Sequence, residues 1–215
     1  MLKFGKWIVI LACVALPVLS GCDEGDEATS GVETSHGGTD LATWMKQYWT
    51  WTISGTGTGR SGDMAYLPLP NATDPDSDGT FTGVLDTTLA AADGFVLPML
   101  AWVGERYDDG TPDDDRTHFS EADFAATTVT VTLDGTKIID SAAGPINDYY
   151  YGPLDFDAPI VYPAPSDYHS IAAIWVQGIG FLHAKLTAGV HTLHLQEHNA
   201  AMGLGYDNTW NITVH

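Results

Sequence analysis

Three aspartates at alternate positions form the most specific chemical pattern in the sequence. Residues 74–79 read Asp-Pro-Asp-Ser-Asp-Gly. Alternate carboxylates followed by a glycine can fold several oxygen ligands around Ca²⁺, because the glycine permits a sharp turn. The position that would supply a bidentate glutamate in such a loop is Leu85. We therefore expect Asp74, Asp76 and Asp78 to bind Ca²⁺ together with Asp86 or a distant acid, and the alternative is a solvated turn.

A second acidic segment spans residues 105–116 and holds one glutamate and five aspartates. Carboxylates at this density repel one another unless cations neutralise them. Arg106 and Arg116 lie within the segment, and they are two of only six lysines and arginines that follow residue 21. We therefore expect an organised loop that binds Ca²⁺, and the alternative is a solvated charged loop. The candidate metal ligands in this segment are Glu105, Asp108, Asp113 and Asp115.

Three consecutive tyrosines, Tyr149, Tyr150 and Tyr151, precede a Gly-Pro pair. Exposed tyrosine rings can stack on the apolar face of a sugar, while their hydroxyl groups bind its OH groups. The run therefore predicts a ligand-binding platform for a glycan. The alternative is that the rings pack against the core, where aromatic side chains contribute most to stability.

The histidines do not follow a zinc or iron pattern. The sequence contains neither His-Glu-x-x-His nor His-x-His. His191 and His194 are three residues apart, a spacing that points them to opposite faces of a strand. A G-x-G-x-x-G match at residues 57–62 is not followed by the start of a helix, so we interpret it as a glycine-rich loop.

These candidate residues need a scaffold, and the sequence predicts one helix followed by strands. Residues 41–48 carry apolar side chains at helical spacing, and Asp40 can cap their first turn. From residue 49 onward tryptophan and isoleucine alternate with threonine, which predicts a strand over residues 49–53.

Later segments alternate in the manner of β-strands or are continuously apolar. Residues 95–103 are typical of a strand buried on both faces, and Pro98 within them indicates an edge position or a bulge. Asp134 and Gly135 lie between two β-rich runs and predict a hairpin over residues 127–139. Further strands are expected at residues 171–182, 188–193 and 208–214. We therefore expect an all-β fold, an antiparallel β-sandwich or jelly roll with one short N-terminal helix.

Charge and the N-terminal segment restrict where the protein acts. The formal net charge of −20 argues against a nucleic-acid partner, because a phosphate backbone requires a positive surface. Residues 1–21 combine two lysines, an apolar run that ends at Leu19, and small residues. This run is shorter than the roughly 20 residues that a transmembrane helix needs, so it predicts an export signal.

The export signal ends in Leu-Ser-Gly followed by Cys22, and this ending resembles the lipobox of bacterial lipoproteins. The resemblance covers residues 1–22. It implies that residues 1–21 are a cleaved signal peptide and that Cys22 is the lipidated N-terminus of the mature protein. It therefore implies a protein anchored by lipid to a membrane of the bacterial cell envelope, with the leaflet and surface exposure left open.

Residues 22–40 have the composition of a flexible tether. They carry six acidic residues, and Val32 is their only large apolar residue. Such a segment cannot bury enough surface to offset the entropy lost on ordering, so we place the folded domain at residues 41–215. The last two expected strands resemble the final hairpin of many secreted bacterial β-sandwich domains, a resemblance that bears on fold alone.

Two classes of function follow from these observations. The first is a lipid-anchored binding or structural module, stabilised by Ca²⁺, for a glycan or a protein partner. The second is a secreted hydrolase of polysaccharides or esters, in which Glu105 acts with an aspartate of residues 113–115 and His118 serves as the base. We favour the first class because the sequence contains no motif for a nucleophile and no metal triad.

Overall fold

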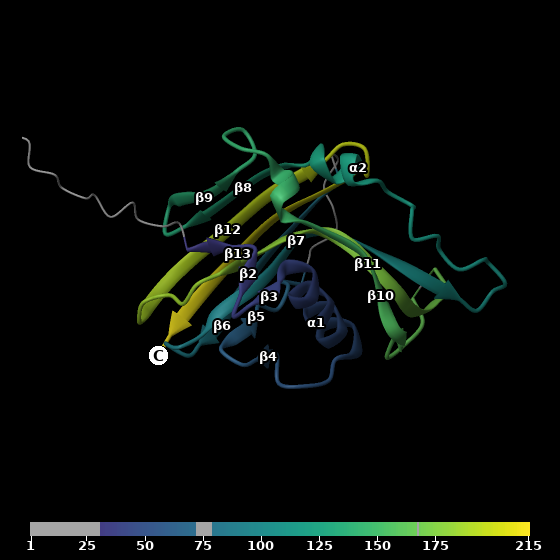
Figure 1. Cartoon of the computed structure of the whole chain (residues 1–215), viewed down its shortest axis with the longest axis horizontal. Coiled ribbons are helices and arrows are strands. Elements are labelled where there is room, and N and C mark those ends of the chain that lie inside the picture. The colour runs from purple at the N-terminus through teal and green to yellow at the C-terminus, as the bar shows by residue number, and fades with distance from the viewer. Residues whose placement is uncertain (1–30, 72–78, 167) are drawn as a thin grey trace, which may run out of the picture.

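The computed structural model describes residues 31–71, 79–166 and 168–215. Strands dominate this part of the chain, which confirms the all-β class (Figure 1). Two large sheets contribute side chains to one hydrophobic core, and helix α1 (Leu41–Ser54) packs against the other face of the larger sheet. Both sheets are mixed, because each contains one strand that runs parallel to its neighbour. The sequence predicted antiparallel pairing throughout.

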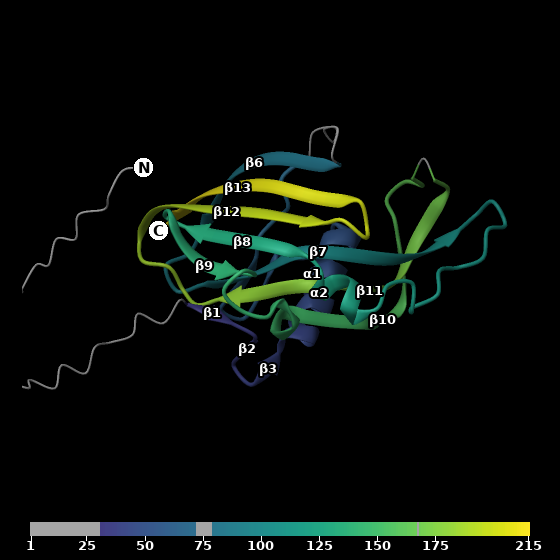
Figure 2. The same cartoon turned by 90° about the horizontal axis from the view of Figure 1, so that it is seen from above.

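The smaller sheet has five strands in the order β6-β13-β12-β8-β9 (Figure 2). The predicted hairpin at Asp134 and Gly135 is confirmed, and both residues have positive φ angles, 52° and 78°. The predicted closing pair is also confirmed, since β12 and β13 are antiparallel along their whole length. The strands are β6 (Thr80–Leu89), β8 (Thr128–Leu133), β9 (Thr136–Asp140), β12 (Gly189–Asn199) and β13 (Leu204–Val214).

The larger sheet is built around one long antiparallel pair, β7 (Gly94–Tyr107) and β11 (Ser170–His183). On the edge of β11 that faces away from β7, β11 pairs with β10 (Tyr150–Val161) and with β1 (Val32–Glu33). On the edge of β7 that faces away from β11, β5 (Met64–Tyr66) pairs in parallel with residues 94–96. The sheet ends with β4 (Arg60–Ser61), which pairs with β5.

Pro98 lies at a bulge in β7, as the sequence predicted. Ile179 of β11 is paired with Leu100, but the next residue, Gly180, is paired with Pro98, so the register shifts at this point. β5 pairs with only the first three residues of β7. In the part of the chain that the structure describes, no strand pairs with β7 after residue 96 on the edge that faces away from β11.

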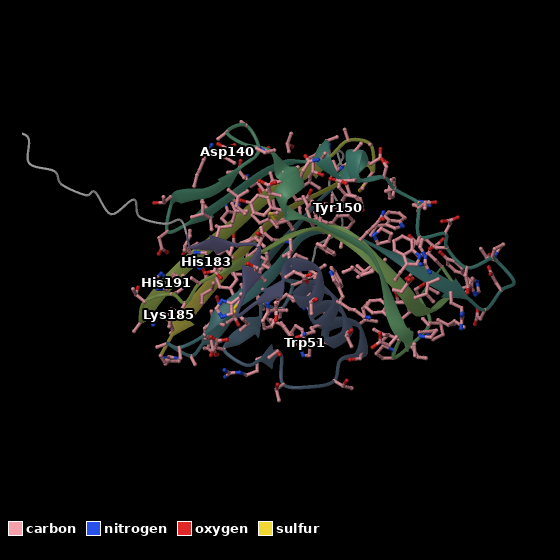
Figure 3. All side chains as sticks on the ribbon, in the orientation of Figure 1. Trp51, Asp140, Tyr150, His183, Lys185 and His191 are labelled. Carbon is pink, nitrogen blue, oxygen red and sulfur yellow. The ribbon has the colours of Figure 1, made fainter. Side chains whose placement is uncertain are left out.

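Helix α1 is longer than the sequence predicted. The cap is confirmed, since the Asp40 carboxylate accepts a hydrogen bond from the Thr43 N–H at 2.8 Å. The helix continues to Ser54 and ends at Gly55, which is left-handed with φ 62° and donates to the Trp51 carbonyl. The predicted strand over residues 49–53 is therefore wrong. Trp49 continues the helical face of buried side chains, while Trp51, labelled in Figure 3, is half-buried on the same helix.

The folded region begins before residue 41. Within the segment that composition assigned to a flexible tether, β1 pairs with residues 182 and 183 of β11. A short hairpin follows, formed by β2 (Ser35–His36) and β3 (Thr39–Asp40). His36 lies within hydrogen-bond distance of the carboxylates of Glu33 (3.0 Å) and Asp63 (3.2 Å). Strand pairing and these polar contacts compensate for the low apolar content, so the tether prediction is wrong for residues 31–40.

Two short helical turns complete the fold, α2 (Glu121–Ala125) and the 3₁₀ turn Ile146–Tyr149. Ser120 and Asp123 cap α2 reciprocally, each side chain bonding the other residue's backbone N–H. Among the described residues, no helix has both the length and the apolar character needed to cross a membrane. The export signal at residues 1–21, Cys22 and the first part of the predicted tether lie outside the described residues.

Candidate functional site

Asp114 fixes the second acidic segment against the end of the larger sheet. Its carboxylate accepts hydrogen bonds from the Glu105 N–H at 3.0 Å and from the Tyr107 hydroxyl at 2.9 Å. Its own N–H donates to the Glu105 carbonyl at 3.0 Å, and its carbonyl accepts from Trp175 Nε1 at 3.3 Å. Burial and the Asp114 carboxylate raise the pKa of Tyr107 to about 12, so its hydroxyl stays a donor at neutral pH. These contacts hold Asp114 in place, while most of the other residues of the segment are exposed.

Asp114→Ala should lower the free energy of unfolding by about 1–3 kcal/mol, because the Glu105 N–H and the Tyr107 hydroxyl lose their common acceptor. Urea unfolding at pH 7 measures the loss. Asp113→Ala is the matched control, since it removes a half-exposed carboxylate paired with Arg106, and it should cost less than about 1 kcal/mol. Equal losses in the two variants would contradict the anchoring role of Asp114.

The structure does not bring the predicted metal ligands of this segment together. Asp113 pairs with Arg106 at 3.1 Å, and Asp108 lies 3.3 Å from His169. Asp115 accepts from the N–H and the hydroxyl of Thr117, both at 2.8 Å. In the described ranges, no group of three or more His, Cys, Asp or Glu side chains is arranged to hold a metal ion. Local donors bind these carboxylates, so a shared cation at Glu105, Asp108, Asp113 and Asp115 finds no support in the geometry.

Glu105 is held by two hydroxyl groups. Tyr162 donates to Oε1 at 2.6 Å, and Ser170 donates to Oε2 at 2.6 Å. Burial and the adjacent Glu105 carboxylate raise the pKa of Tyr162 well above its usual range. His118, the proposed base, stacks instead on Trp102 with ring centroids 5.0 Å apart. His118 therefore has an aromatic partner of its own, whereas Asp114, one of the three candidate aspartates, accepts a hydrogen bond from the Glu105 N–H.

The three tyrosines do not present one exposed face, so the predicted platform is corrected. Tyr151 is 2% exposed, and its hydroxyl accepts a hydrogen bond from Trp49 Nε1 at 2.8 Å. Tyr149 and Tyr150 are half-buried against the core, and the Tyr150 ring lies 5.7 Å from that of Phe124 (Figure 3). Alternation along β10 explains why Tyr150 and Tyr151 point to opposite faces, whereas Tyr149 belongs to the 3₁₀ turn that precedes the strand. The alternative of core packing is the better description.

Asp74, Asp76 and Asp78 lie outside the described residues. Their calcium site therefore stays a prediction from sequence spacing.

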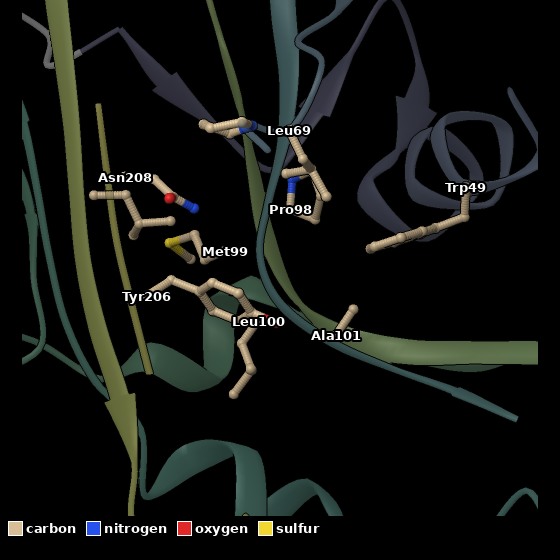
Figure 4. A pocket seen from close by; sticks show the side chains of 10 residues that line it. Trp49, Leu69, Pro98, Met99, Leu100, Ala101, Tyr206 and Asn208 are labelled. Carbon is tan, nitrogen blue, oxygen red and sulfur yellow. The ribbon is translucent and has the colours of Figure 1, made fainter. Parts of the chain in front are cut away.

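The strongest candidate site is a cavity of about 250 Å³ between the two sheets (Figure 4). We call it the inter-sheet cavity. Its walls are residues 69–70, residues 98–101 of β7, Trp49 of α1, and three residues of the smaller sheet, Leu195, Tyr206 and Asn208. Apolar side chains make up most of this wall, and an apolar cavity of roughly 150 Å³ already accommodates a molecule such as benzene. The bulge at Pro98 forms part of the wall, so the irregularity of β7 helps to shape the cavity.

Asn208 supplies a polar group to this apolar wall. It is 5% exposed, and its Oδ1 has no hydrogen-bond partner among the described residues. Figure 4 shows its amide directed toward the side chains that line the cavity. A buried acceptor without a donor costs free energy, so a ligand that brings a donor to this point gains affinity. The cavity thus combines an apolar volume with one fixed polar contact, the usual form of a small-molecule site.

Glu197 is a second buried polar residue on the core face of the smaller sheet, but it is not among the residues that line the inter-sheet cavity. It is 5% exposed, and neither carboxyl oxygen has a partner in the part of the chain that is described. It is paired with Tyr206 and follows Leu195 by two residues on the same face of β12, and both of these neighbours line the cavity. Burial raises the pKa of Glu197 to about 9, so the carboxyl is neutral at pH 7.

The sequence patterns single out neither Asn208 nor Glu197, although a signal for both exists. The alternation of Leu193 and Leu195 places position 197 on the core face of the same strand, and Trp210 and Ile212 do the same for position 208. A polar residue at a core-facing strand position is uncommon and marks either a hydrogen-bonded core group or a site. The cavity itself leaves no such signal, because it depends on how distant segments pack.

No family model matches the chain, and no curated protein matches it.

Proposed function

We propose that this protein is a lipid-anchored binding module of the bacterial cell envelope whose ligand places an apolar group in the inter-sheet cavity. One observation carries the proposal: an apolar cavity of about 250 Å³ that contains a buried amide oxygen without a partner among the described residues. A site of this kind binds by burial of apolar surface and orients its ligand through the single polar contact.

The envelope location rests on the N-terminal sequence. The basic start, the apolar run and the Leu-Ser-Gly-Cys ending support export followed by lipidation of Cys22. We also propose that the two facing sheets form a β-sandwich, to which α1 adds a third layer. The proposal also includes stabilisation by Ca²⁺ bound to Asp74, Asp76 and Asp78, and the spacing of these aspartates in the sequence is its only support.

Binding is a better account than hydrolysis for this geometry. The carboxylate of Glu105 is occupied by Tyr162 and Ser170, and His118 is stacked on an aromatic ring. The chemistry of the cavity wall also favours an apolar group over a polyhydroxylated glycan, because sugar hydroxyls would meet few polar partners there. An apolar side chain of an envelope protein and a small organic molecule both fit this description.

Ethylbenzene is a suitable probe because it is apolar and small enough for the cavity. We expect ligand-observed NMR to detect its binding to the purified protein, and we expect the midpoint of thermal unfolding to rise with its concentration. Ala101→Leu adds volume to the cavity wall and should weaken binding at least tenfold. Ala143→Leu, an exposed position in the turn after β9, is the matched control and should leave binding unchanged. Absence of binding, or equal binding to both variants, would overturn the proposal.

A further inference from the structure

The inter-sheet cavity lies beside an unpaired length of β7. β5 ends at Tyr66, and the Pro68 carbonyl already accepts a hydrogen bond from Trp210 of the smaller sheet at 2.7 Å. Over residues 97–103, no strand in the described ranges pairs with β7 on the side away from β11, and we call this length the free edge. Residues 98–101 also form part of the cavity wall, so the cavity occupies the first part of the free edge (Figure 4).

Two residues of the free edge direct their backbone groups outward. The Glu105 N–H donates to the Asp114 carboxylate, and the Glu105 carbonyl accepts from the Asp114 N–H, so the Glu105 backbone points away from β11. Alternate residues of a strand direct their N–H and C=O groups to the same edge, and those of Val103 and Ala101 therefore also point away from β11. In the part of the chain that the structure describes, no other residue bonds to these outward groups.

The side chains of the free edge do not protect it against pairing. Proteins usually guard an exposed edge with charged side chains, with prolines or with a covering segment. Residues 99–103 read Met-Leu-Ala-Trp-Val, with no charge and no proline. Ala101, Trp102 and Val103 are partly exposed. An extended peptide can therefore add to β7 as a further strand, with backbone hydrogen bonds to Ala101 and Val103.

The cavity adds a side-chain requirement to this backbone pairing. Successive side chains of an added strand alternate between the two faces of the sheet. The cavity has walls on both faces, since Trp49 of α1 lines it from one side, and Leu195 and Tyr206 of the smaller sheet line it from the other. Its volume of about 250 Å³ exceeds the roughly 150 Å³ that accommodates benzene, so one large apolar side chain of the added strand fits within it.

The charge beside the free edge favours a basic partner. The acidic segment begins at Glu105, four residues beyond Ala101, or roughly 13 Å along an extended strand. Within residues 105–116, six acidic side chains accompany only two arginines, and the whole chain has a formal net charge of −20. Lysine or arginine residues that flank the apolar residue of the added strand therefore meet negative charge, whereas acidic residues in their place would be repelled.

We propose that the ligand of the inter-sheet cavity is an extended, basic segment of a partner protein, which adds to the free edge of β7 as a strand and places one large apolar side chain in the cavity. This inference rests on the binding function proposed above and adds the chemical class of the ligand. Backbone pairing with Ala101 and Val103 supplies affinity that does not depend on the sequence of the segment. The cavity and the acidic segment select its apolar and basic residues.

The synthetic peptide acetyl-Lys-Lys-Thr-Phe-Thr-Lys-Lys-amide is the probe, and we expect it to bind the purified protein in an NMR titration. Replacing its phenylalanine by alanine should weaken binding at least tenfold, and replacing its lysines by glutamate at least fivefold. N-methylation of the phenylalanine and both threonines removes the backbone donors from both edges of its central part, and should also weaken binding at least tenfold.

Ethylbenzene separates the two proposals. If ethylbenzene binds and the peptide does not, the strand proposal is overturned and the cavity function stands, whereas failure of both probes to bind would overturn both. Equal binding of the N-methylated peptide would overturn strand addition. Equal binding of the glutamate peptide would overturn the preference for a basic segment, and equal binding of the alanine peptide would overturn the placement of its side chain in the cavity.

Amide hydrogen exchange locates the contact on β7. The outward N–H groups of Ala101 and Val103 have no partner in the described chain, so the bound peptide should slow their exchange at least tenfold. Ethylbenzene occupies the cavity alone and should leave the exchange of Val103, which does not line the cavity, unchanged. Unchanged exchange of both residues in the peptide complex would overturn the placement on the free edge.

Val103→Pro removes one outward N–H and leaves the bonds between β7 and β11 in place. Peptide binding should weaken about fivefold, while ethylbenzene binding should stay unchanged. Val103→Thr keeps both the N–H and a β-branched side chain, so it is the matched control and should bind the peptide as the wild type does. Undiminished peptide binding to folded Val103→Pro would overturn pairing at this residue. The N-methylated peptide tests the same pairing on the unaltered protein, which keeps the proposal falsifiable if Val103→Pro does not fold.

Discussion

Glu197→Met should raise the free energy of unfolding by roughly 3 kcal/mol at pH 7. The carboxyl is 5% exposed, has no partner in the described part of the chain, and has a pKa raised by burial from 4.5 to about 9. Folding at pH 7 therefore requires the uptake of a proton by a group that is ionised in the unfolded chain. At about 1.4 kcal/mol for each pH unit above the unfolded pKa, this uptake costs roughly 3 kcal/mol, and methionine removes the cost while filling a similar volume.

The pH dependence of stability provides the sharper test of this prediction. Because the folded-state pKa of Glu197 lies above the unfolded value of 4.5, the folded protein binds a proton that the unfolded chain lacks between about pH 4.5 and 9. The stability of the wild type should therefore fall as the pH rises through this window, relative to Glu197→Gln, which cannot titrate. Urea unfolding of both proteins at pH 5, 7 and 8.5 measures the difference.

Comparison of wild type with Glu197→Gln cancels the contributions of the histidines and of the many exposed carboxylates. Glu121→Gln, which alters an exposed carboxylate on α2, serves as the control, and its difference from wild type should stay within about 0.5 kcal/mol at every pH. A constant difference between wild type and Glu197→Gln would show that Glu197 has an ordinary pKa in the folded protein, and it would contradict the buried, unpaired state on which the prediction depends.

Local patterns were sufficient to predict the strands that face the core on one side. Leu193 and Leu195 on β12, and Trp210 and Ile212 on β13, follow the period of two that a half-buried strand requires. The turn at Asp134 and Gly135 was predictable for the same reason, since its chemistry is contained in two neighbouring residues. These elements depend on contacts that are short in sequence or on a simple alternation of side chains.

Features that depend on distant partners were not predictable from the sequence. The residue types around Glu105 are compatible with a metal ligand or a catalytic acid, but the hydroxyl groups that bind it belong to Tyr162 and Ser170, 57 and 65 residues away. The parallel pairing of β6 with β13 likewise joins segments more than 100 residues apart. In α1, the alternation of tryptophan and threonine resembled a strand locally, while tertiary packing continued the helix past Tyr48.

The largest loss of stability is expected for Gly104→Ala. A Cβ atom at this position would lie 1.9 Å from Cε2 and 2.0 Å from Nε1 of Trp175, far inside van der Waals contact. The Trp175 ring is 2% exposed, and its Nε1 donates to the Asp114 carbonyl, so movement of the ring would break one of the contacts that hold Asp114. Overpacking of a core costs about 1–3 kcal/mol in typical cases, and we expect a loss of at least about 3 kcal/mol in urea unfolding.

Gly144→Ala is the matched control for this substitution, because no heavy atom beyond Gly144 and its two chain neighbours lies within 4 Å of the place that the added methyl group would take, and its backbone φ is not positive. Its effect should be within about 0.5 kcal/mol of zero or slightly stabilising, since alanine restricts the unfolded chain. Replacing the ring as well, in Gly104→Ala combined with Trp175→Leu, should destabilise by less than the sum of the two single substitutions, because the clash disappears with the ring. Additive losses would mean that the methyl group at position 104 does not clash with the Trp175 ring.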